Sequence, residues 1–256
     1  MTDLSINLNK IALIRNSRVT QYPSVLEHAN MCITAGCDGI TVHPRPDQRH
    51  IRASDCYELA DNIKVELNIE GNPFAPPMKS TRSDVSDYPG FMELIRDIKP
   101  AQCTLVPDSN DQLTSDHGFD LTASGEKLKP VIDELLELGV RVSLFMDPDI
   151  EQIKLAAKLG VDRIELYTEA YADAVLHNSN ISGTLAQYVA AANATIALGL
   201  GVNAGHDLNL TNLIQFKHAM PELLEVSIGH AFTVDCIEMG LVKAVTAYQK
   251  ALGKPV

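Results

Sequence analysis

Short hydrophobic runs typical of β-strands alternate with longer helical patterns along the whole 256-residue chain. No linker rich in Pro, Ser or Gly interrupts this alternation, so we expect a single catalytic domain over residues 1–256. The pattern predicts eight strands, at residues 4–9, 39–43, 64–70, 102–106, 141–147, 163–168, 200–204 and 223–229.

Helical patterns fill the segments between these strands. In the helix predicted over residues 149–159, we expect Asp149 to cap the start, Gln152 to complete a capping box and Gly160 to end it. Pro130 interrupts another helical pattern and predicts either a kink or the true start of that helix.

Strands that are joined by helical crossovers run parallel, and their connections are right-handed. Eight such units favour closure into a barrel over an open doubly wound sheet. The sequence therefore predicts an α/β fold, a single-domain (β/α)₈ TIM barrel with possible extra helices.

Polar and apolar residues alternate within most of the predicted strands, so that each strand has one polar side. Because the helices must pack on the apolar side, the polar side is expected to face the barrel lumen. An antiparallel sheet with one wet face is the alternative, which the helical crossovers disfavour. The polar positions are Asn7, Asn9, Thr41, His43, Asn68, Glu70, Ser143, Glu165 and Ser227.

Cysteine usage and the N-terminal residues indicate a cytoplasmic protein. The five cysteines are scattered without a CxxC pair, which fits a reducing compartment. The first residues lack the basic and apolar regions of a secretory signal, and no stretch approaches the roughly 20 apolar residues of a membrane span. We expect no membrane partner.

A formal net charge of −12 argues against non-specific nucleic-acid binding, which requires cations to neutralise the phosphate backbone. Small anions can still bind where positive charge is local. Positively charged residues cluster between residues 10 and 52, and the simplest interpretation of this cluster is a solvated basic edge. Its members are Lys10, Arg15, Arg18, Arg45, Arg49 and Arg52.

Four ionisable residues are predicted at the C-terminal ends of strands, where barrel enzymes place their active sites. They are His43, Glu70, His206 and His230. A hydrogen-bonded structural role suits any single histidine, whereas convergence from four strand ends favours catalysis. A carboxylate and imidazoles in one dry pocket can divide proton donation and acceptance.

Two other chemistries remain open for these residues. The same histidines and glutamate could ligate zinc, although no HxH, HExxH or CxxC spacing supports a metal, and we predict none. Lys10 is the only lysine near a strand's C-terminal end and could form a Schiff base.

Two segments are candidates for binding phosphate. The turns Ala204-Gly-His206 and Ile228-Gly-His230 allow close backbone approach, and a helix beginning near Ala231 would direct its positive end there. The loop 43–52 holds three arginines and two histidines, and arginine suits bidentate phosphate contacts. Alternatively, those arginines pair with surface acids.

Along nearly the whole chain, these motifs resemble the pyridoxine 5'-phosphate synthase family of vitamin B6 biosynthesis. The resemblance rests on Asn7-Leu-Asn-Lys-Ile-Ala-Leu-Ile-Arg-Asn-Ser-Arg18, Gly39-Ile-Thr-Val-His-Pro-Arg45, Arg49-His-Ile-Arg52, Leu67-Asn-Ile-Glu70, Leu105-Val-Pro107, Val142-Ser-Leu-Phe145, Ile164-Glu-Leu-Tyr-Thr168, Val202-Asn-Ala-Gly-His206 and Ile228-Gly-His230.

The resemblance implies condensation of 3-amino-2-oxopropyl phosphate with 1-deoxy-D-xylulose 5-phosphate, loss of phosphate and water, and closure of a pyridine ring. It implies no organic cofactor and suggests a homo-octamer. His43 would accept a proton, Glu70 would shuttle protons, His206 would donate one and Glu165 would stabilise developing positive charge. Substrate contacts would come from Asn7, Arg18, Arg45, His50, Thr114, Gly229 and His230.

Two positions depart from the family pattern. Many members have Asp-His where this chain has Asn9-Lys10, and Gly where it has Asp207. Both departures fall among the expected substrate contacts, so they could alter affinity. A phosphosugar aldolase or isomerase on the same barrel, and a non-catalytic phosphometabolite-binding protein, remain alternatives because one fold hosts many chemistries.

Overall fold

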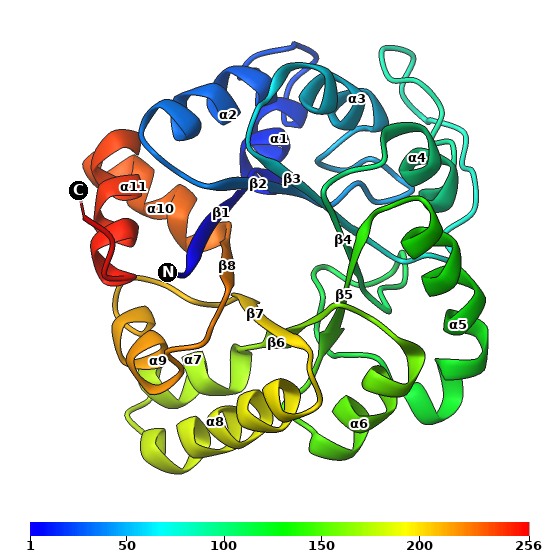
Figure 1. Ribbon diagram of the computed structural model, residues 1–256. Coiled ribbons are helices and arrows are strands. Elements are labelled where there is room, and N and C mark those ends of the chain that lie inside the picture. The colour runs from blue at the N-terminus through cyan, green and yellow to red at the C-terminus, as the bar shows by residue number, and fades with distance from the viewer. Residues whose placement is uncertain (256) are drawn as a thin grey trace.

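A computed structural model describes residues 1–255 of the chain. Eight parallel strands form a closed barrel in the order in which they occur in the sequence. The blue β1 and the orange β8 lie side by side in Figure 1 and close the barrel, with Leu4 paired to Val226. The strands are β1 (Asp3–Asn7), β2 (Gly39–Val42), β3 (Glu66–Gly71), β4 (Gln102–Leu105), β5 (Arg141–Met146), β6 (Arg163–Tyr167), β7 (Gly201–His206) and β8 (Glu225–Ile228).

Eleven helices surround the strands within the described residues (Figure 1). A minimal barrel has one helix after each strand, whereas here the segments after β1, β6 and β8 each contain two. The helices are α1 (Asn9–Asn16), α2 (Val25–Thr34), α3 (Ala53–Asn62), α4 (Phe91–Ile98), α5 (Leu121–Glu137), α6 (Ile150–Leu159), α7 (Glu169–Leu176), α8 (Ile181–Ala197), α9 (Leu213–Ala219), α10 (His230–Met239) and α11 (Leu241–Ala251).

The structure therefore confirms the predicted barrel, its eight strands and its extra helices. The ends of the strands differ from the prediction by a few residues. Asn9 does not belong to the first strand, because Leu8 leaves the extended conformation and Asn9 begins α1. His206 is the last residue of β7 instead of following it.

Apolar strand residues face outward and pack against the helices, whereas the lumen is polar as predicted. Ser5 Oγ and Thr41 Oγ1 lie 2.7 Å apart, and Thr41 Oγ1 also accepts a hydrogen bond from Asn68 Nδ2 at 3.4 Å. The hydroxyl of Thr104 lies within hydrogen-bond distance of Asn68 Oδ1 at 3.2 Å and of Glu165 Oε2 at 3.4 Å. This network leads from the interior of the barrel toward the C-terminal ends of the strands.

Gly205 makes room for the carboxylate of Glu165 in this lumen. A Cβ atom at position 205 would lie 2.5 Å from Glu165 Oε1 and 2.9 Å from the carbonyl oxygen of Ser227. The glycine is therefore required by close approach, and it lets β7 pass a buried acid.

Two helix predictions were wrong in part. Helix α5 begins at Leu121, so Pro130 lies inside the helix and does not start it. Asp149 caps α6 as predicted, accepting from the backbone N–H groups of Glu151 and Gln152. The side chain of Gln152, however, accepts a hydrogen bond from the backbone N–H of Leu121 at 2.8 Å and so ties α6 to the start of α5 instead of completing a capping box.

Within residues 1–255, no helix combines the length and the apolar character that crossing a membrane requires.

Candidate active site

A cavity of about 370 Å³ opens at the C-terminal ends of the barrel strands. Its lining brings together all but one of the residues that the sequence analysis singled out for catalysis or substrate binding. Arg18 is the exception, because it is exposed beyond the end of α1 and does not line the cavity. The cavity residues among them are Asn7, Asn9, Lys10, His43, Arg45, His50, Glu70, Thr114, Glu165, His206, Asp207, Gly229 and His230.

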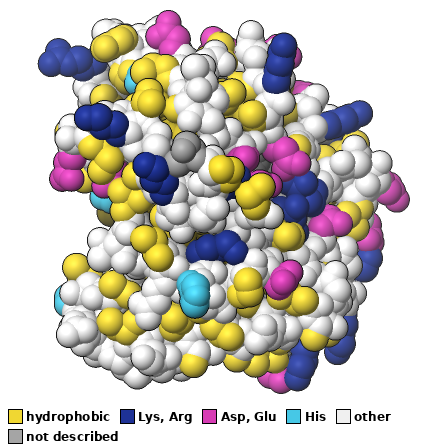
Figure 2. All heavy atoms as spheres, turned by 60° about the vertical axis from the view of Figure 1, so that its left-hand side comes forward, with side chains coloured by type: hydrophobic (Ala, Val, Ile, Leu, Met, Phe, Trp, Pro, Cys, Tyr) yellow, Lys and Arg dark blue, Asp and Glu magenta, His cyan; other side chains and the backbone are white. Residues whose placement is uncertain are grey.

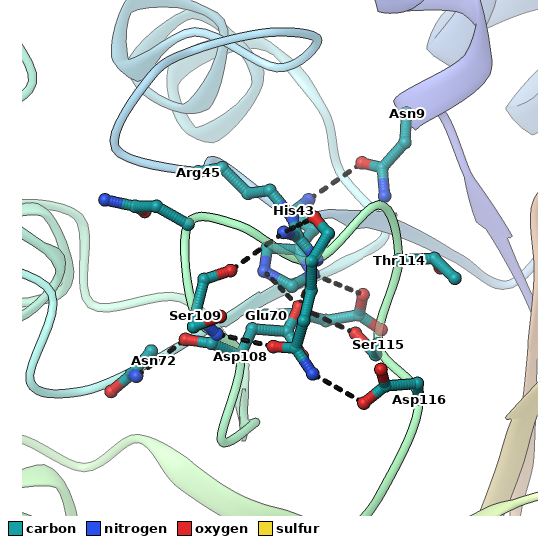
Figure 3. A network of polar contacts seen from close by, with 12 residues as sticks. Asn9, His43, Arg45, Glu70, Asn72, Asp108, Ser109, Thr114, Ser115 and Asp116 are labelled. Atoms are coloured by element: carbon teal, nitrogen blue, oxygen red, sulfur yellow. Dashed lines mark hydrogen bonds and ion pairs between the residues drawn. The ribbon is translucent and has the colours of Figure 1, made fainter.

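His43 lies between two carboxylates, as Figure 3 shows. Its Nδ1 is 3.7 Å from Glu70 Oε2, and its Nε2 is 3.7 Å from Asp108 Oδ2. Asn9 Oδ1 accepts a hydrogen bond from the backbone N–H of His43 at 2.9 Å, which fixes the residue directly after β2. The first residue of α1 thus positions the catalytic candidate at the end of the neighbouring strand.

Burial controls the charge of this group. Burial, and secondarily the positive charge of Arg45, lower the pKa of His43 to about 3. Burial raises the pKa of Glu70 well above its ordinary value, and the neighbouring acids Glu165 and Asp108 raise it further. A neutral imidazole beside a carboxyl group that holds its proton is suited to exchanging protons with a bound substrate.

Glu165 projects into the lumen from β6 and is almost completely buried. Burial and the negative charge of Glu225 raise its pKa, while the hydrogen bond from Thr104 opposes this shift. Glu165 and Glu70 both line the cavity, so two acids of raised pKa lie beneath the substrate space.

His206 occupies a strained position at the end of β7. Its φ angle is +73°, in the left-handed region that residues other than glycine rarely adopt. Its Nε2 lies 2.8 Å from Thr114 Oγ1, and its Nδ1 lies 2.5 Å from Asp207 Oδ2. The ring of Tyr167 packs edge-on against the imidazole, with ring centroids 5.1 Å apart. Strain of this kind persists where the surrounding structure determines it, which is frequent in active sites.

The arginines of the basic loop after β2 form ion pairs and hydrogen bonds with other groups of the protein. In this loop Arg45 forms an ion pair with the buried Asp108, and in the neighbouring α1 Arg15 forms one with Asp55. Arg49 pairs with Asp47 at 2.7 Å. The alternative interpretation of the loop 43–52, in which its arginines pair with acids, is therefore supported for Arg45 and Arg49, although the partner of Arg45 is buried and does not lie at the surface.

Two arginines of this loop also hold the segment between β4 and α5. The guanidinium groups of Arg45 and Arg49 both donate to the carbonyl oxygen of Gln112, at 2.7 and 2.9 Å. Arg49 donates further to the carbonyl oxygen of Asn110 at 2.5 Å. Because Thr114 follows in the same segment and contacts His206, these contacts connect the loop after β2 with the strand-seven histidine.

Other cavity residues are available to anions. Lys10 and His50 line the cavity on the side of the basic loop, and Lys10 has no ion pair among residues 1–255. Gly229 precedes α10, whose N-terminus has no side-chain cap within the described part of the chain. The first N–H groups of this helix and its dipole favour an anion.

Sequence reasoning missed Asp108, which accepts from Arg45 and from the hydroxyl of Ser115 at 2.8 Å. Its place shortly after the predicted fourth strand was a usable signal, since barrel enzymes place their active sites at the C-terminal ends of strands. Phe145 and Val106 were also missed as lining residues, because apolar residues at strand ends carry no chemical signal of their own.

No group of three or more His, Cys, Asp or Glu side chains is arranged to hold a metal ion within residues 1–255.

Comparison with known families bears on what this pocket does. The family described as "Pyridoxal phosphate biosynthesis protein PdxJ" matches residues 4–254. The chain belongs to this family. One protein to which the chain is similar comes from Xanthomonas campestris pv. campestris (strain B100) and is named pyridoxine 5'-phosphate synthase. It is 52% identical over 250 residues, which cover 96% of this chain and 94% of that protein. A protein of the same name from Xylella fastidiosa (strain M23) is 49% identical over 251 residues, covering 96% and 93% of the two chains.

Solved structures of other barrels resemble the chain in fold alone. Tryptophan synthase from M. tuberculosis superimposes with a TM-score of 0.62 at 10% identity, covering 98% of this chain and 92% of that one. The KGPDC structure from Streptococcus mutans gives a TM-score of 0.61 at 9% identity, covering 99% and 98%. The aldolase, isomerase and binding-protein alternatives are not favoured, because PdxJ membership rests on far higher identity along the whole chain.

Proposed function

We propose that this pocket condenses 3-amino-2-oxopropyl phosphate with 1-deoxy-D-xylulose 5-phosphate, releases phosphate and water, and closes the ring of pyridoxine 5'-phosphate, with the whole chain acting as one catalytic domain. The observation that carries the proposal is the buried set of His43, Glu70 and Glu165 under a cavity with cationic residues at its rim. Ring closure needs repeated proton transfers, and this set supplies groups that can make them.

In this proposal His43 accepts a proton, because its lowered pKa keeps the imidazole neutral and its lone pair available. Glu70, 3.7 Å away, donates and recovers protons during dehydration and ring closure. Asn7 Nδ2 lies 3.4 Å from Glu70 Oε2, so a hydrogen bond there orients the carboxyl group.

His206 donates a proton from the opposite side of the cavity, and Glu165 stabilises positive charge that develops on the substrate nitrogen. A carboxyl group whose pKa is raised by burial gains most from ionising when a cation forms beside it. The position of Glu165 beneath the cavity supports this role.

The two phosphates bind at different parts of the rim. Lys10, Arg45 and His50 supply one site, with Asn9 and Thr114 completing the contacts. Asn7, Gly229, His230 and the N-terminus of α10 supply the second, with Asp207 at its edge. Arg18, which lies outside the cavity lining, stays a prediction from the family resemblance alone.

The direct test is to incubate the purified protein with both phosphorylated substrates and to follow pyridoxine 5'-phosphate and free phosphate together. We expect both products in equal amounts. Substrate binding without either product would contradict the proposal and support a binding protein instead. Borohydride trapping of one substrate on Lys10 would support the aldolase alternative.

We also infer that the protein forms a homo-oligomer, an octamer by family resemblance. An apolar groove lies between α1, α2, α10 and α11 and is lined by Ile14, Met31 and Ile237 among others. Ile237 is 77% exposed and lies beside other exposed apolar residues of the groove. Exposed apolar side chains that lie together mark surfaces that contact other proteins. Figure 2, which brings this side of the molecule forward, shows hydrophobic side chains at the surface among polar and charged ones.

A cytoplasmic location belongs to the same proposal. All five cysteines are free thiols, and four of them are buried. Reduced cysteines and small phosphorylated substrates are typical of the cytoplasm.

A further inference from the structure

Asp207 and Thr114 contact the two nitrogens of the same imidazole ring. The carboxylate oxygen Oδ2 of Asp207 lies 2.5 Å from His206 Nδ1, and Thr114 Oγ1 lies 2.8 Å from His206 Nε2. Since a carboxylate can only accept, the proton at this contact belongs to Nδ1. The Nε2 atom, which contacts the cavity residue Thr114, is then the nitrogen left to exchange a proton.

We propose that Asp207 is a positioning residue that keeps a proton on His206 Nδ1 and directs Nε2 toward the substrate. The inference rests on the proposed function in that it serves His206 as proton donor. It assigns to Asp207 an action through the histidine, beyond the substrate contact expected from its place in the sequence. A partner at one ring nitrogen fixes the protonation of the other.

The backbone around Asp207 is held in place. The carbonyl oxygen of Asp207 accepts hydrogen bonds from Asn212 Nδ2 at 3.2 Å and from Asn209 Nδ2 at 3.4 Å. Asn212 is buried, and the edge-on ring of Tyr167 limits rotation of the imidazole. The strained φ angle of His206 sets the direction from which its side chain meets Asp207. The geometry of the pair is therefore defined by the surrounding protein.

The other titratable groups around His206 leave this assignment to Asp207. From β6, Tyr167 faces the ring, and burial and Glu169 raise the pKa of its phenol, so it carries no charge. After β2, His43 is neutral because burial lowers its pKa. After β4, Asp108 is engaged by Arg45 and Ser115. Among residues 1–255, Asp207 is the carboxylate in hydrogen-bond contact with His206.

With the Nδ1 proton held by the carboxylate, Nε2 is the nitrogen that gives up a proton to the substrate and takes one back. Asp207→Asn keeps an acceptor of the same shape and removes the charge. We expect turnover at saturating substrate to fall about tenfold while KM changes less than twofold, because the amide no longer fixes the proton on Nδ1.

The matched control is Asp116→Asn. Asp116 Oδ1 lies 2.5 Å from Nδ1 of the adjacent His117, both side chains are 54% exposed, and neither residue lines the cavity. This variant should leave turnover and KM unchanged. Asp207→Glu, which keeps a carboxylate at this position, should recover part of the turnover.

Nitrogen-15 NMR of the histidine rings gives a readout that does not depend on activity. In the wild type, neutral His206 should carry its proton on Nδ1, and in Asp207→Asn the Nε2-protonated tautomer should increase. This result supports the inference whether or not the wild type makes pyridoxine 5'-phosphate, so failure of the proposed function is distinguishable. An unchanged tautomer, or an Asp207→Asn enzyme with wild-type turnover, would overturn the inference.

Discussion

Burial determines which pocket residues carry charge. Glu70 and His43 are both strongly buried, and desolvation moves the pKa of each toward its neutral form, up for the acid and down for the imidazole. The sequence alone left open whether the pKa of Glu70 is raised or lowered, because an imidazolium neighbour would have lowered it. The structure shows that the neighbouring imidazole is neutral and that the other close charges are acids.

The raised pKa of Glu70 lowers the free energy of unfolding at high pH. The pKa of Glu70 is higher in the folded protein than in the unfolded chain. The stability that the protonated carboxyl group contributes is therefore fully present below about pH 4.5 and is lost as the pH rises through the folded pKa. Glu70→Gln removes that loss, and each unit of raised pKa corresponds to about 1.4 kcal/mol. We expect the variant to be more stable than the wild type at pH 8.

Urea unfolding of both proteins at pH 5 and pH 8 measures this difference. The advantage of Glu70→Gln should be small at pH 5 and larger at pH 8. A difference of the same size at both pH values would mean that the carboxyl group titrates normally in the folded protein.

The catalytic candidates could be predicted from sequence, whereas their partners could not. His43, Glu70 and His206 follow from their places at strand ends. Arg45, which we propose binds a phosphate, is also paired with Asp108, 63 positions along the chain, and the sequence did not indicate this partner. Partners at such separations are set by the closure of the barrel and leave no local pattern.

At the scale of elements, periodicity predicted all eight strands, and their ends were the weaker part. Leu8 interrupts β1 before Asn9, because α1 begins there and Asn9 turns to hold the backbone of His43. Gln152 had the spacing of a capping box, but the start of α5 offers it a backbone N–H from a different helix. Local rules give way where a neighbouring element supplies a better partner.

Pro130 departs from the rule that proline is absent from the interior of a helix. It lies within α5, where proline cannot donate the backbone hydrogen bond to the carbonyl of residue 126. Its side chain is exposed, so replacement leaves no cavity. We expect Pro130→Ala to raise the free energy of unfolding by about 1 to 3 kcal/mol, as measured by urea denaturation. Lower stability would show that the ring of Pro130 contributes packing or limits the unfolded chain by more than the missing bond costs.

At the scale of the whole molecule, the polar lumen and the cavity are consequences of closing the barrel. Polar positions scattered along the sequence meet only when β1 pairs with β8, which brings Asn7 and Gly229 to the same rim as His43. Alternation predicted the polar side of each strand, whereas the apolar groove between α1, α2, α10 and α11 depends on how the helices pack and was not predicted.

The groove carries the prediction about assembly. Ile237 lies in the groove and is 77% exposed, whereas Leu176 is 76% exposed at the end of α7, outside it. If copies of the chain associate through the groove, Ile237→Asp buries a charge in the interface and should reduce the molar mass measured by light scattering. Leu176→Asp is the matched control and should leave the mass unchanged. An oligomer that persists in Ile237→Asp would place the interface elsewhere.

The central claim is that Glu70 moves protons in a condensation carried out in this pocket. The most direct measurement is the rate of pyridoxine 5'-phosphate formation at saturating concentrations of both substrates, for the wild type and for Glu70→Gln. Glutamine keeps the shape of the side chain and removes its ability to exchange protons, so turnover should fall by about 10²-fold or more in a folded protein. A folded Glu70→Gln enzyme with near-normal turnover would contradict the account and leave the proton transfers to His43 and His206.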